Sequence, residues 1–195
     1  MTWKSYDEIY EHIGRFCVDF EQFCRSMEAC VRNILHSQGL TNESIQTILL
    51  AGSTAAPLRA LLQNLIGEVI GTEENRALLS KAFKELQEIT EERNDLIHSK
   101  WFVYGYVTEE ETAEFLAEGE KLHANRDGEA VKNFTLSKEN IEELINRCME
   151  AGIIVSLLTR CVLGVREVHE CFSINDKALV INYDALRPVK VKSEK

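Results

Sequence analysis

Hydrophobic residues recur at intervals of three and four along most of this chain, which is the spacing of one face of an α-helix. The pattern is strongest between about residues 9 and 36. Its apolar stripe comprises Phe16, Phe20, Phe23, Met27, Val31 and Ile34. Gly39 follows, and a glycine just past the last periodic residue is typical of a helix end. The pattern therefore predicts a long first helix.

The same spacing predicts a short helix and then a second long one. Thr41 or Asn42 caps the short helix, because both residue types accept bonds from free N–H groups at a helix start. The second long helix has Pro57 in its first turn and ends near Gly71. Its hydrophobic positions are Leu58, Leu61, Leu62, Leu65, Ile66 and Val69.

Two more long helices follow on either side of a non-helical excursion. The first is capped by Thr72, with Glu73 and Glu74 in its first turn, where the helix dipole favours anions. The second is capped by Ser137 or Thr135. Its apolar positions repeat with a period near 3.5, which favours packing in a bundle. They are Ile141, Ile145, Cys148, Gly152, Val155, Thr159 and Val162, and Gly152 is expected to allow close approach of another helix.

The excursion at about residues 101–134 follows a different pattern. Residues 101–107 alternate aromatic and aliphatic side chains, which predicts a short strand. Residues 108–119 are acidic and predict a short helix, and residues 122–128 predict a turn. Residues 131–134 are expected to pair back to the first strand as a hairpin. A short strand at Ala178–Ile181 and a C-terminal tail at about residues 173–195 complete the prediction.

These elements predict an all-α protein, an up-and-down bundle of four to five helices with a short strand or hairpin excursion. Residues 1–195 suit a single domain. Only two prolines, Pro57 and Pro188, interrupt the chain, so long helices are permitted almost everywhere.

Charge and cysteine spacing narrow the classes of function. The net charge of −10 argues against broad, nonspecific binding to nucleic acid, although it leaves room for a local basic cleft. None of the six cysteines forms a C-x-x-C pair, so no metal and no cofactor are expected. The sequence shows neither a signal peptide nor a run of 18 apolar residues, which predicts a cytoplasmic protein without a membrane span.

The chemistry-bearing stretch is residues 91–101, at the end of the third long helix. Asn94 and His98 are four residues apart and share one helix face. Arg93 and His98 are five apart, so in an unbroken helix they diverge by about 140°. They converge only if the last turn loosens, or if a second copy of the helix supplies the other half.

The sequence Arg93-Asn94-x-x-x-His98, followed by Ser99-Lys100-Trp101, resembles the Arg-polar-x-x-x-His signature of the HEPN superfamily. The resemblance covers roughly residues 10–172, and the motif is its specific part. It implies a HEPN-like helical domain. Many members are metal-independent ribonucleases, often toxins or antiviral effectors, in which two protomers bring their motifs together. Other members have lost the activity and act as scaffolds or nucleotide-binding accessories.

The resemblance assigns roles that suit the side chains. Arg93 stabilises phosphate through paired donors, His98 transfers protons near neutral pH, and Asn94 has a positioning role, either by donating to phosphate or by holding His98. Lys100 and Tyr104 are candidate substrate-binding residues, since an aromatic ring can stack on a base. The implied partners are an RNA substrate, a second copy across the Arg93/His98 motif, and an antitoxin or regulatory protein.

Two alternatives remain open. One is a noncatalytic HEPN helical module that binds a partner protein or a nucleotide, which the acidic charge favours. The other is a purely structural bundle, in which Arg93 and His98 serve only the helix end, are separated in the dimer and face solvent. Glu91 and Glu92 either orient Arg93 or are ordinary exposed glutamates.

Overall fold

The computed structural model describes residues 3–107, 113–125 and 128–188, and for residues 113, 122–125 and 128–130 it describes the backbone alone. The fold is mostly helical, as expected, but a three-stranded antiparallel sheet and a separate hairpin make it α+β. The prediction of an all-α protein is therefore wrong. None of the helices in the described part of the chain is long and apolar enough to cross a membrane.

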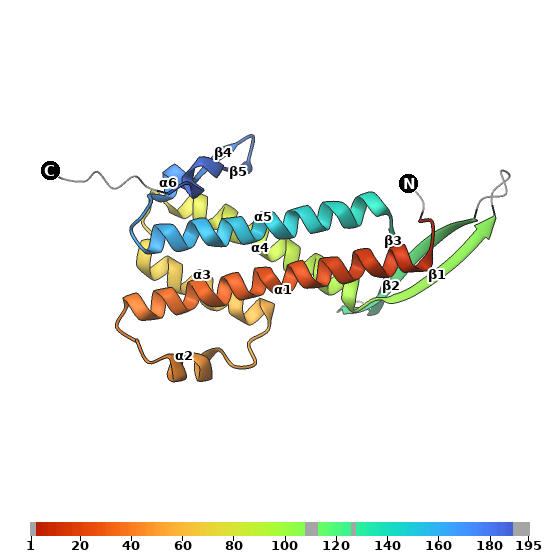
Figure 1. The fold of residues 1–195 in the computed structure, drawn as a ribbon, viewed down its shortest axis with the longest axis horizontal. Helices are drawn as coiled ribbons and strands as arrows, with labels where there is room; N and C mark the ends of the chain where they lie inside the picture. Colours follow the sequence, from red (N-terminus) through yellow and green to blue (C-terminus); the bar gives the residue numbers. More distant parts are fainter. Residues whose placement is uncertain (1–2, 108–112, 126–127, 189–195) are drawn as a thin grey trace. The chain divides into compact units, whose positions relative to one another are not determined.

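Three long helices account for most of the chain: α1 (Tyr6–Ser37), α4 (Arg76–Ile97) and α5 (Lys138–Val162). All three were predicted, and Figure 1 shows each as one continuous helix. The chain divides into two compact units, each made of two segments. Unit 1 comprises residues 1–22 and 89–149, and unit 2 comprises residues 23–88 and 150–195. Each long helix therefore contributes one part to each unit.

The sheet belongs to unit 1. Its strands are β1 (Lys100–Val107), β2 (Ala113–Asn125) and β3 (Gly128–Leu136), in the order β1-β2-β3. Two predictions fail here. The acidic stretch at 108–119 is expected to be helical, but from residue 113 it forms β2, while residues 108–112 lie outside the described residues. β3 pairs with β2 and not with β1, so β2 is the central strand.

The physical reason is an alternation within β2. Ala117 and Gly119 face inward and are buried, whereas the glutamates on either side of Gly119 face outward. A Cβ added at Gly119 would lie 2.5 Å from the ring of Phe134 and 3.0 Å from that of Trp101. Gly119 thus leaves the space in which these two rings meet edge to face, with centroids 5.3 Å apart.

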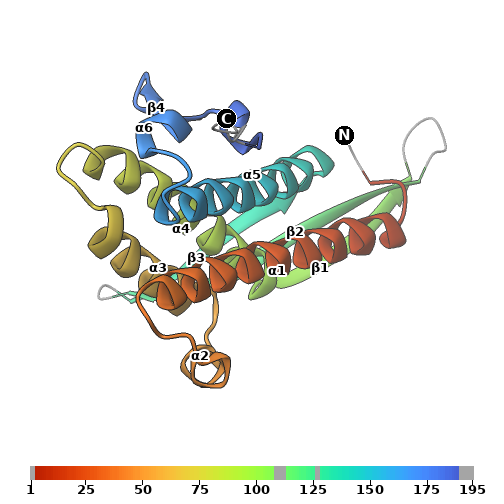
Figure 2. The same cartoon turned by 60° about the vertical axis from the view of Figure 1, so that its left-hand side comes forward.

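Trp3 joins the start of the chain to this sheet. Its backbone bridges Phe115 of β2, and its indole nitrogen donates to the carbonyl of Leu136 over 2.7 Å. Figures 1 and 2 both show the first turns of α1 running beside the sheet. The core of unit 1 consists of Trp3, Ile9, Phe16, Phe20, Ile89, Leu96, Ala117, Leu136, Ile141, Ile145 and Cys148.

Unit 2 contains α2 (Glu43–Leu50) and α3 (Ala55–Ile70), both as predicted. The side chain of Asn42 caps α2 by accepting from the N–H of Ile45 over 3.2 Å. Gly39 takes a positive φ of 93°, the backbone conformation expected of a glycine after a helix end. Buried residues of this unit include Phe23, Met27, Val31, Ile34, Leu58, Leu62, Ile66, Phe83, Leu86, Val155, Leu158 and Phe172.

The C-terminal part of unit 2 is more ordered than a tail. Helix α6 (Val168–Cys171) leads into a hairpin of β4 (Phe172–Asn175) and β5 (Ala178–Ile181), followed by the 3-10 helix η1 (Tyr183–Leu186). The strand at Ala178–Ile181 is confirmed. The tail predicted from residue 173 is wrong as far as residue 188, and residues 189–195 lie outside the described residues.

Helix boundaries give three further outcomes. Ser137 caps α5 by accepting from the N–H of Asn140 over 3.1 Å, as predicted. Thr72 accepts from the N–H of Asn75 over 3.3 Å and closes a turn, so α4 begins only at Arg76. Glu73 therefore precedes the helix. Among the described residues the expected close approach at Gly152 is not found, because a Cβ added there meets nothing within 4 Å.

Candidate functional site

The site begins where α4 ends, and side chains determine that end. The last carbonyls of a helix have no partner within it. Here Lys121 donates to the carbonyl of Asn94 over 3.2 Å, and Trp101 donates to that of Leu96 over 2.7 Å. The hydroxyl of Ser99 donates to the carbonyl of Asp95. Three consecutive carbonyls are satisfied in this way, so the chain leaves the helix and enters β1.

This helix end brings Arg93 and His98 together within one chain. His98 lies just beyond the last helical residue, although its N–H still bonds to the carbonyl of Asn94 over 3.1 Å. Nη1 of Arg93 lies 3.5 Å from Nε2 of His98. The two side chains therefore approach each other within one chain, with the helical hydrogen bond of His98 kept. The purely structural alternative concerns how far apart the two motifs lie in a dimer, and the distance within one chain does not bear on it.

Arg93 is held from two further sides. Its Nη1 also donates to Oδ1 of Asn94 over 3.3 Å, so Asn94 bonds to the guanidinium, whereas the sequence predicted that it would hold His98 or donate to phosphate. The guanidinium lies over the ring of Phe20 of α1, 5.4 Å from the centroid, within the range of a cation–π contact. A planar cation stacked in this way keeps edge N–H groups available to an anion.

Asp95 ties this helix end to the sheet. Its Oδ1 accepts from Lys121 of β2 over 2.8 Å, and its Oδ2 accepts from Lys132 of β3. The two lysines are direct partners in the register of β2 and β3. Although burial raises the pKa of Asp95, the bonds from both ammonium groups outweigh it and leave the pKa below its ordinary value.

Glu92, a candidate to orient Arg93, pairs with a different arginine. Nη1 of Arg147 on α5 donates to both carboxylate oxygens of Glu92, over 2.5 and 2.7 Å. Glu92 therefore joins α4 to α5 within unit 1. Glu91 lies on the exposed side of the helix.

Basic side chains are concentrated at this end of α4 despite the acidity of the chain. Arg93, Lys121 and Lys132 all donate to Asn94 or Asp95. His98 and Lys100 follow, and both are exposed. The negative side chain bonded within this set is Asp95. Glu91 and Glu92 precede Arg93 in the helix and Glu120 lies opposite Lys100, so these basic side chains alternate with carboxylates.

The two predicted substrate-binding residues lie further along, on β1. Lys100 and Tyr104 occupy alternate positions and share the outward face of the sheet. The pKa of Tyr104 is raised, first by its hydrogen bond to Glu118. A carboxylate in contact with this hydroxyl makes it a poor neighbour for a phosphodiester.

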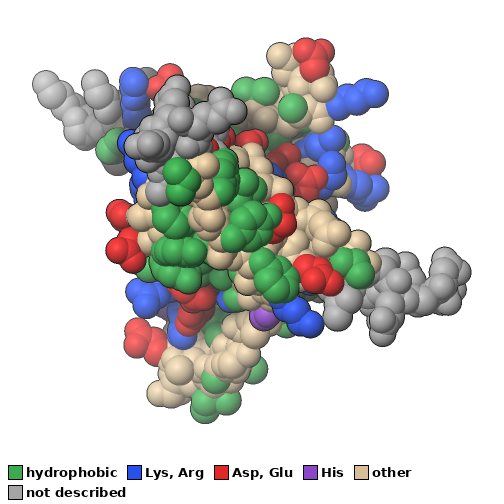
Figure 3. All heavy atoms as spheres, turned by 90° about the vertical axis from the view of Figure 1, so that its right-hand side faces the viewer, with side chains coloured by type: hydrophobic (Ala, Val, Ile, Leu, Met, Phe, Trp, Pro, Cys, Tyr) green, Lys and Arg blue, Asp and Glu red, His purple; other side chains and the backbone are tan. Residues whose placement is uncertain are grey.

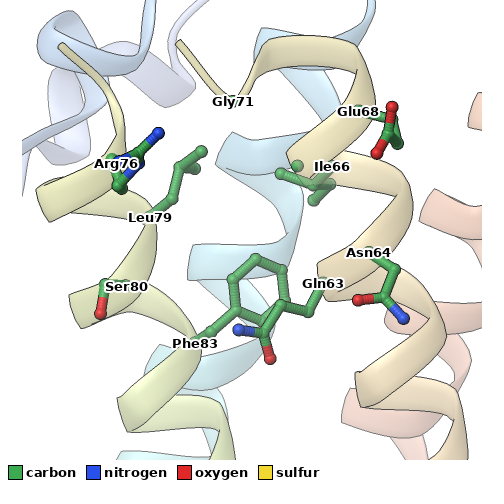
Figure 4. Close-up of a pocket in the computed structure, with 10 residues that line it drawn as sticks. Gln63, Asn64, Ile66, Glu68, Gly71, Arg76, Leu79, Ser80 and Phe83 are labelled. Carbon is green, nitrogen blue, oxygen red and sulfur yellow. The ribbon is translucent and has the colours of Figure 1, made fainter. Parts of the chain in front are cut away.

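Two cavities are relevant to the functional assignment of this chain. One of about 350 Å³ lies beside the same end of α4 and is lined by Glu92, Asp95, Phe134, Asn140 and Arg147, among others. A larger one of about 480 Å³ lies in unit 2 between α3 and α4. Figure 4 shows Ile66 on α3 and Leu79 and Phe83 on α4 pointing into the space between these helices. No group of three metal-ligating side chains occurs among the described residues.

Sequence reasoning found the motif but missed Asp95, Lys121, Lys132 and Arg147. The alternation of residues 114–120 was the available signal. Had it been interpreted as a strand, Lys121 would have been placed on the inward face with Trp101 and Phe134. The pairing of Arg147 with Glu92 has no local signal, because the two residues are 55 positions apart.

No protein-family model matches the chain, and no curated protein and no solved structure matches it.

Proposed function

We propose that this chain is a metal-independent endoribonuclease of the HEPN type, a toxin or antiviral effector that acts as a homodimer. The observation that carries the proposal is the approach of the Arg93 guanidinium to within 3.5 Å of Nε2 of His98 at an exposed helix end. The three long helices and the position of the motif at the end of α4 agree with a HEPN-like helical domain.

The chemistry follows from these groups. RNA carries its own nucleophile, the 2′-hydroxyl, whose proton is taken by a base as the oxygen attacks the adjacent phosphorus. The bond from phosphorus to the 5′-oxygen breaks, and an acid protonates that leaving oxygen. An imidazole serves either step near neutral pH. The guanidinium of Arg93 stabilises the charge that develops on the phosphate oxygens.

The homodimer completes this scheme. One motif supplies one imidazole, whereas simultaneous removal and delivery of a proton uses two groups. A second copy of the helix end supplies the second imidazole and a second guanidinium. Arg93, bonded to Asn94, is the cation of the motif, and Lys121 and Lys132, bonded to Asp95, are two further cations at this helix end in a chain of net charge −10.

The direct test is cleavage of a fluorophore-labelled RNA in EDTA. Arg93→Ala and His98→Ala are each expected to lower the rate by about a hundredfold or more. Arg15→Ala and His36→Ala are the matched controls, because they remove the same residue types from exposed positions on α1. Equal cleavage by His98→Ala and the unaltered protein would remove the assignment.

The dimer requirement has its own test. Heterodimers of unaltered and His98→Ala chains, purified by two different tags, are expected to lose nearly all activity if both imidazoles act on one RNA. Retention of about half of the activity would mean that each motif works alone.

A noncatalytic, nucleotide-binding HEPN module is the second candidate. The larger cavity, in unit 2, favours it, because Gln63, Asn64 and Ser80 supply polar groups around an apolar floor. This alternative expects thermal stabilisation of the protein by ATP or GTP and no effect of His98→Ala on that shift. Absence of any shift at millimolar nucleotide counts against it.

A further inference from the structure

The outward face of the three-stranded sheet carries a row of exposed aromatic rings. Phe102, Tyr104 and Tyr106 occupy alternate positions of β1, with exposed fractions of 55, 43 and 40%. Such alternation places all three on the same face. Figure 3 looks onto the end of the sheet where β1 ends, and hydrophobic side chains gather there with acidic ones around them.

Carboxylates lie beside these rings. The register places Glu118 opposite Phe102, Glu114 opposite Tyr106 and Glu120 opposite Lys100, and directly opposed residues share a face. Tyr106 donates to Glu114 over 2.8 Å, and Tyr104 donates to Glu118. Three carboxylates therefore face one ammonium among the described side chains of this surface.

A hollow of about 420 Å³ opens on the same face. Its outward-facing lining consists of Phe102, Glu118, Glu120, Asn133 and Thr135. The combination of a ring face, two carboxylates, an amide and a hydroxyl suits a cation, which a ring attracts and carboxylates bind. No lysine or arginine of the described chain forms an ion pair with Glu118 or Glu120.

β1 is also an edge strand. Within the described residues it pairs only with β2, so its other edge keeps unpaired backbone groups. An edge of this kind accepts an extended peptide, and alternate side chains of that peptide then lie on the aromatic face. Backbone pairing and cation recognition are thus available side by side.

We propose that this surface, defined by Phe102, Tyr104, Tyr106, Glu118 and Glu120, binds an extended, arginine-bearing segment of another protein. The negative charge of this surface determines which kind of molecule can bind there. A second copy of the same face would oppose carboxylate to carboxylate, and RNA would bring phosphates against Glu118 and Glu120. A guanidinium seated on Phe102 and bonded by those two carboxylates meets no such repulsion. This proposal does not rest on RNA cleavage.

The test measures fluorescence anisotropy of a short fluorescein-labelled peptide in which arginine alternates with threonine. The same peptide with citrulline for arginine keeps the shape and removes the charge. The arginine peptide is expected to bind the unaltered protein at least about tenfold more tightly than its citrulline counterpart. Equal binding of both peptides would overturn the proposal.

Variants distinguish binding of the peptide at this site from binding to acidic residues in general. Glu118→Gln/Glu120→Gln is expected to weaken binding by about tenfold, and Phe102→Ala by about threefold. Glu21→Gln/Glu74→Gln removes the same charge from exposed positions elsewhere and is expected to change binding by less than about twofold. An equal loss in the control pair contradicts the proposal.

The two rejected occupants are tested in parallel. Displacement of the peptide by single-stranded RNA would assign the face to nucleic acid. A fall in molar mass by light scattering on Phe102→Ala would assign it to a second copy. Either result overturns the proposal, whereas an unchanged mass and no displacement support it.

Discussion

Replacement of Asp95 by asparagine tests whether one carboxylate joins the end of α4 to the sheet. Asp95 accepts from Lys121 over 2.8 Å and also from Lys132. The side chains of Asp95 and Lys121 are 24 and 19% exposed, whereas that of Lys132 is 55% exposed. The substituted amide keeps one acceptor oxygen and no charge, so it leaves an ammonium group of low exposure without its counterion.

The magnitude follows from the exposure of the two pairs. A charge-assisted bond between groups of low exposure contributes about 1.5–3 kcal/mol, and an exposed pair contributes less than about 1 kcal/mol. Allowing for the remaining acceptor, we expect Asp95→Asn to lower the free energy of unfolding by about 2 kcal/mol. In a chain of 195 residues this corresponds to a fall in Tm of about 5 °C.

The pH dependence has a definite sign. The pKa of Asp95 in the folded protein lies below its ordinary value of 3.8. A depressed carboxyl pKa adds stability at pH values above the ordinary one, and this is lost as the pH falls through the folded value. Urea unfolding should therefore show the full difference between unaltered protein and Asp95→Asn at pH 7, and a smaller difference below about pH 4.

The control is Asp184→Asn. Asp184 pairs with Arg187 over 3.1 Å, but these side chains are 73 and 78% exposed, so a loss below about 0.5 kcal/mol is expected. If the two variants are equally stable at pH 7, or if the difference for Asp95→Asn does not change with pH, the carboxylate does not anchor the sheet.

Other predictions concern the sheet and the helix end. Gly119→Ala should lower the free energy of unfolding by about 1–3 kcal/mol, because the added Cβ meets Phe134 at 2.5 Å, whereas Gly14→Ala, with nothing within 4 Å, should raise it by about 0.5–1 kcal/mol. Urea titrations of both would show the contrast, and equal effects would contradict the account of the rings. Trp101→Phe should cost about 1–2 kcal/mol in the same titrations, because the carbonyl of Leu96 loses its donor. No loss of stability would mean that a water molecule donates to this carbonyl in place of the indole.

The helices could be predicted because the residues that define each one lie close together in the sequence. Stripes such as Phe16–Phe20–Phe23 and caps such as Asn42 and Ser137 lie within a few residues of the elements that they define. The predicted start of α4 was wrong, since Thr72 closes a turn before the helix instead of capping it.

Only the first part of β2 was predicted as a helix, within the acidic stretch at 108–119, and its last residues fall in the turn predicted at 122–128. What makes it a strand is nonlocal. Ala117 and Gly119 are small where Trp101 and Phe134 must meet, and those rings come from the two neighbouring strands. A single stretch of sequence does not contain that information.

The motif, too, could be predicted only in part. The residue types and spacing of Arg93, Asn94 and His98 were evident, but their convergence depends on how the helix ends. That end is determined by Ser99, Trp101 and Lys121, and the last of these lies 27 residues from the carbonyl to which it donates.

Each compact unit is discontinuous along the chain, because α1, α4 and α5 all contribute to both. A deletion that keeps one unit intact must cut through three helices, so fragments cannot be used to assign a role to either unit. Genetic dissection of the two units must proceed by single substitutions in the uncut polypeptide, and a loss of function in a fragment that divides these helices says nothing about which unit was needed.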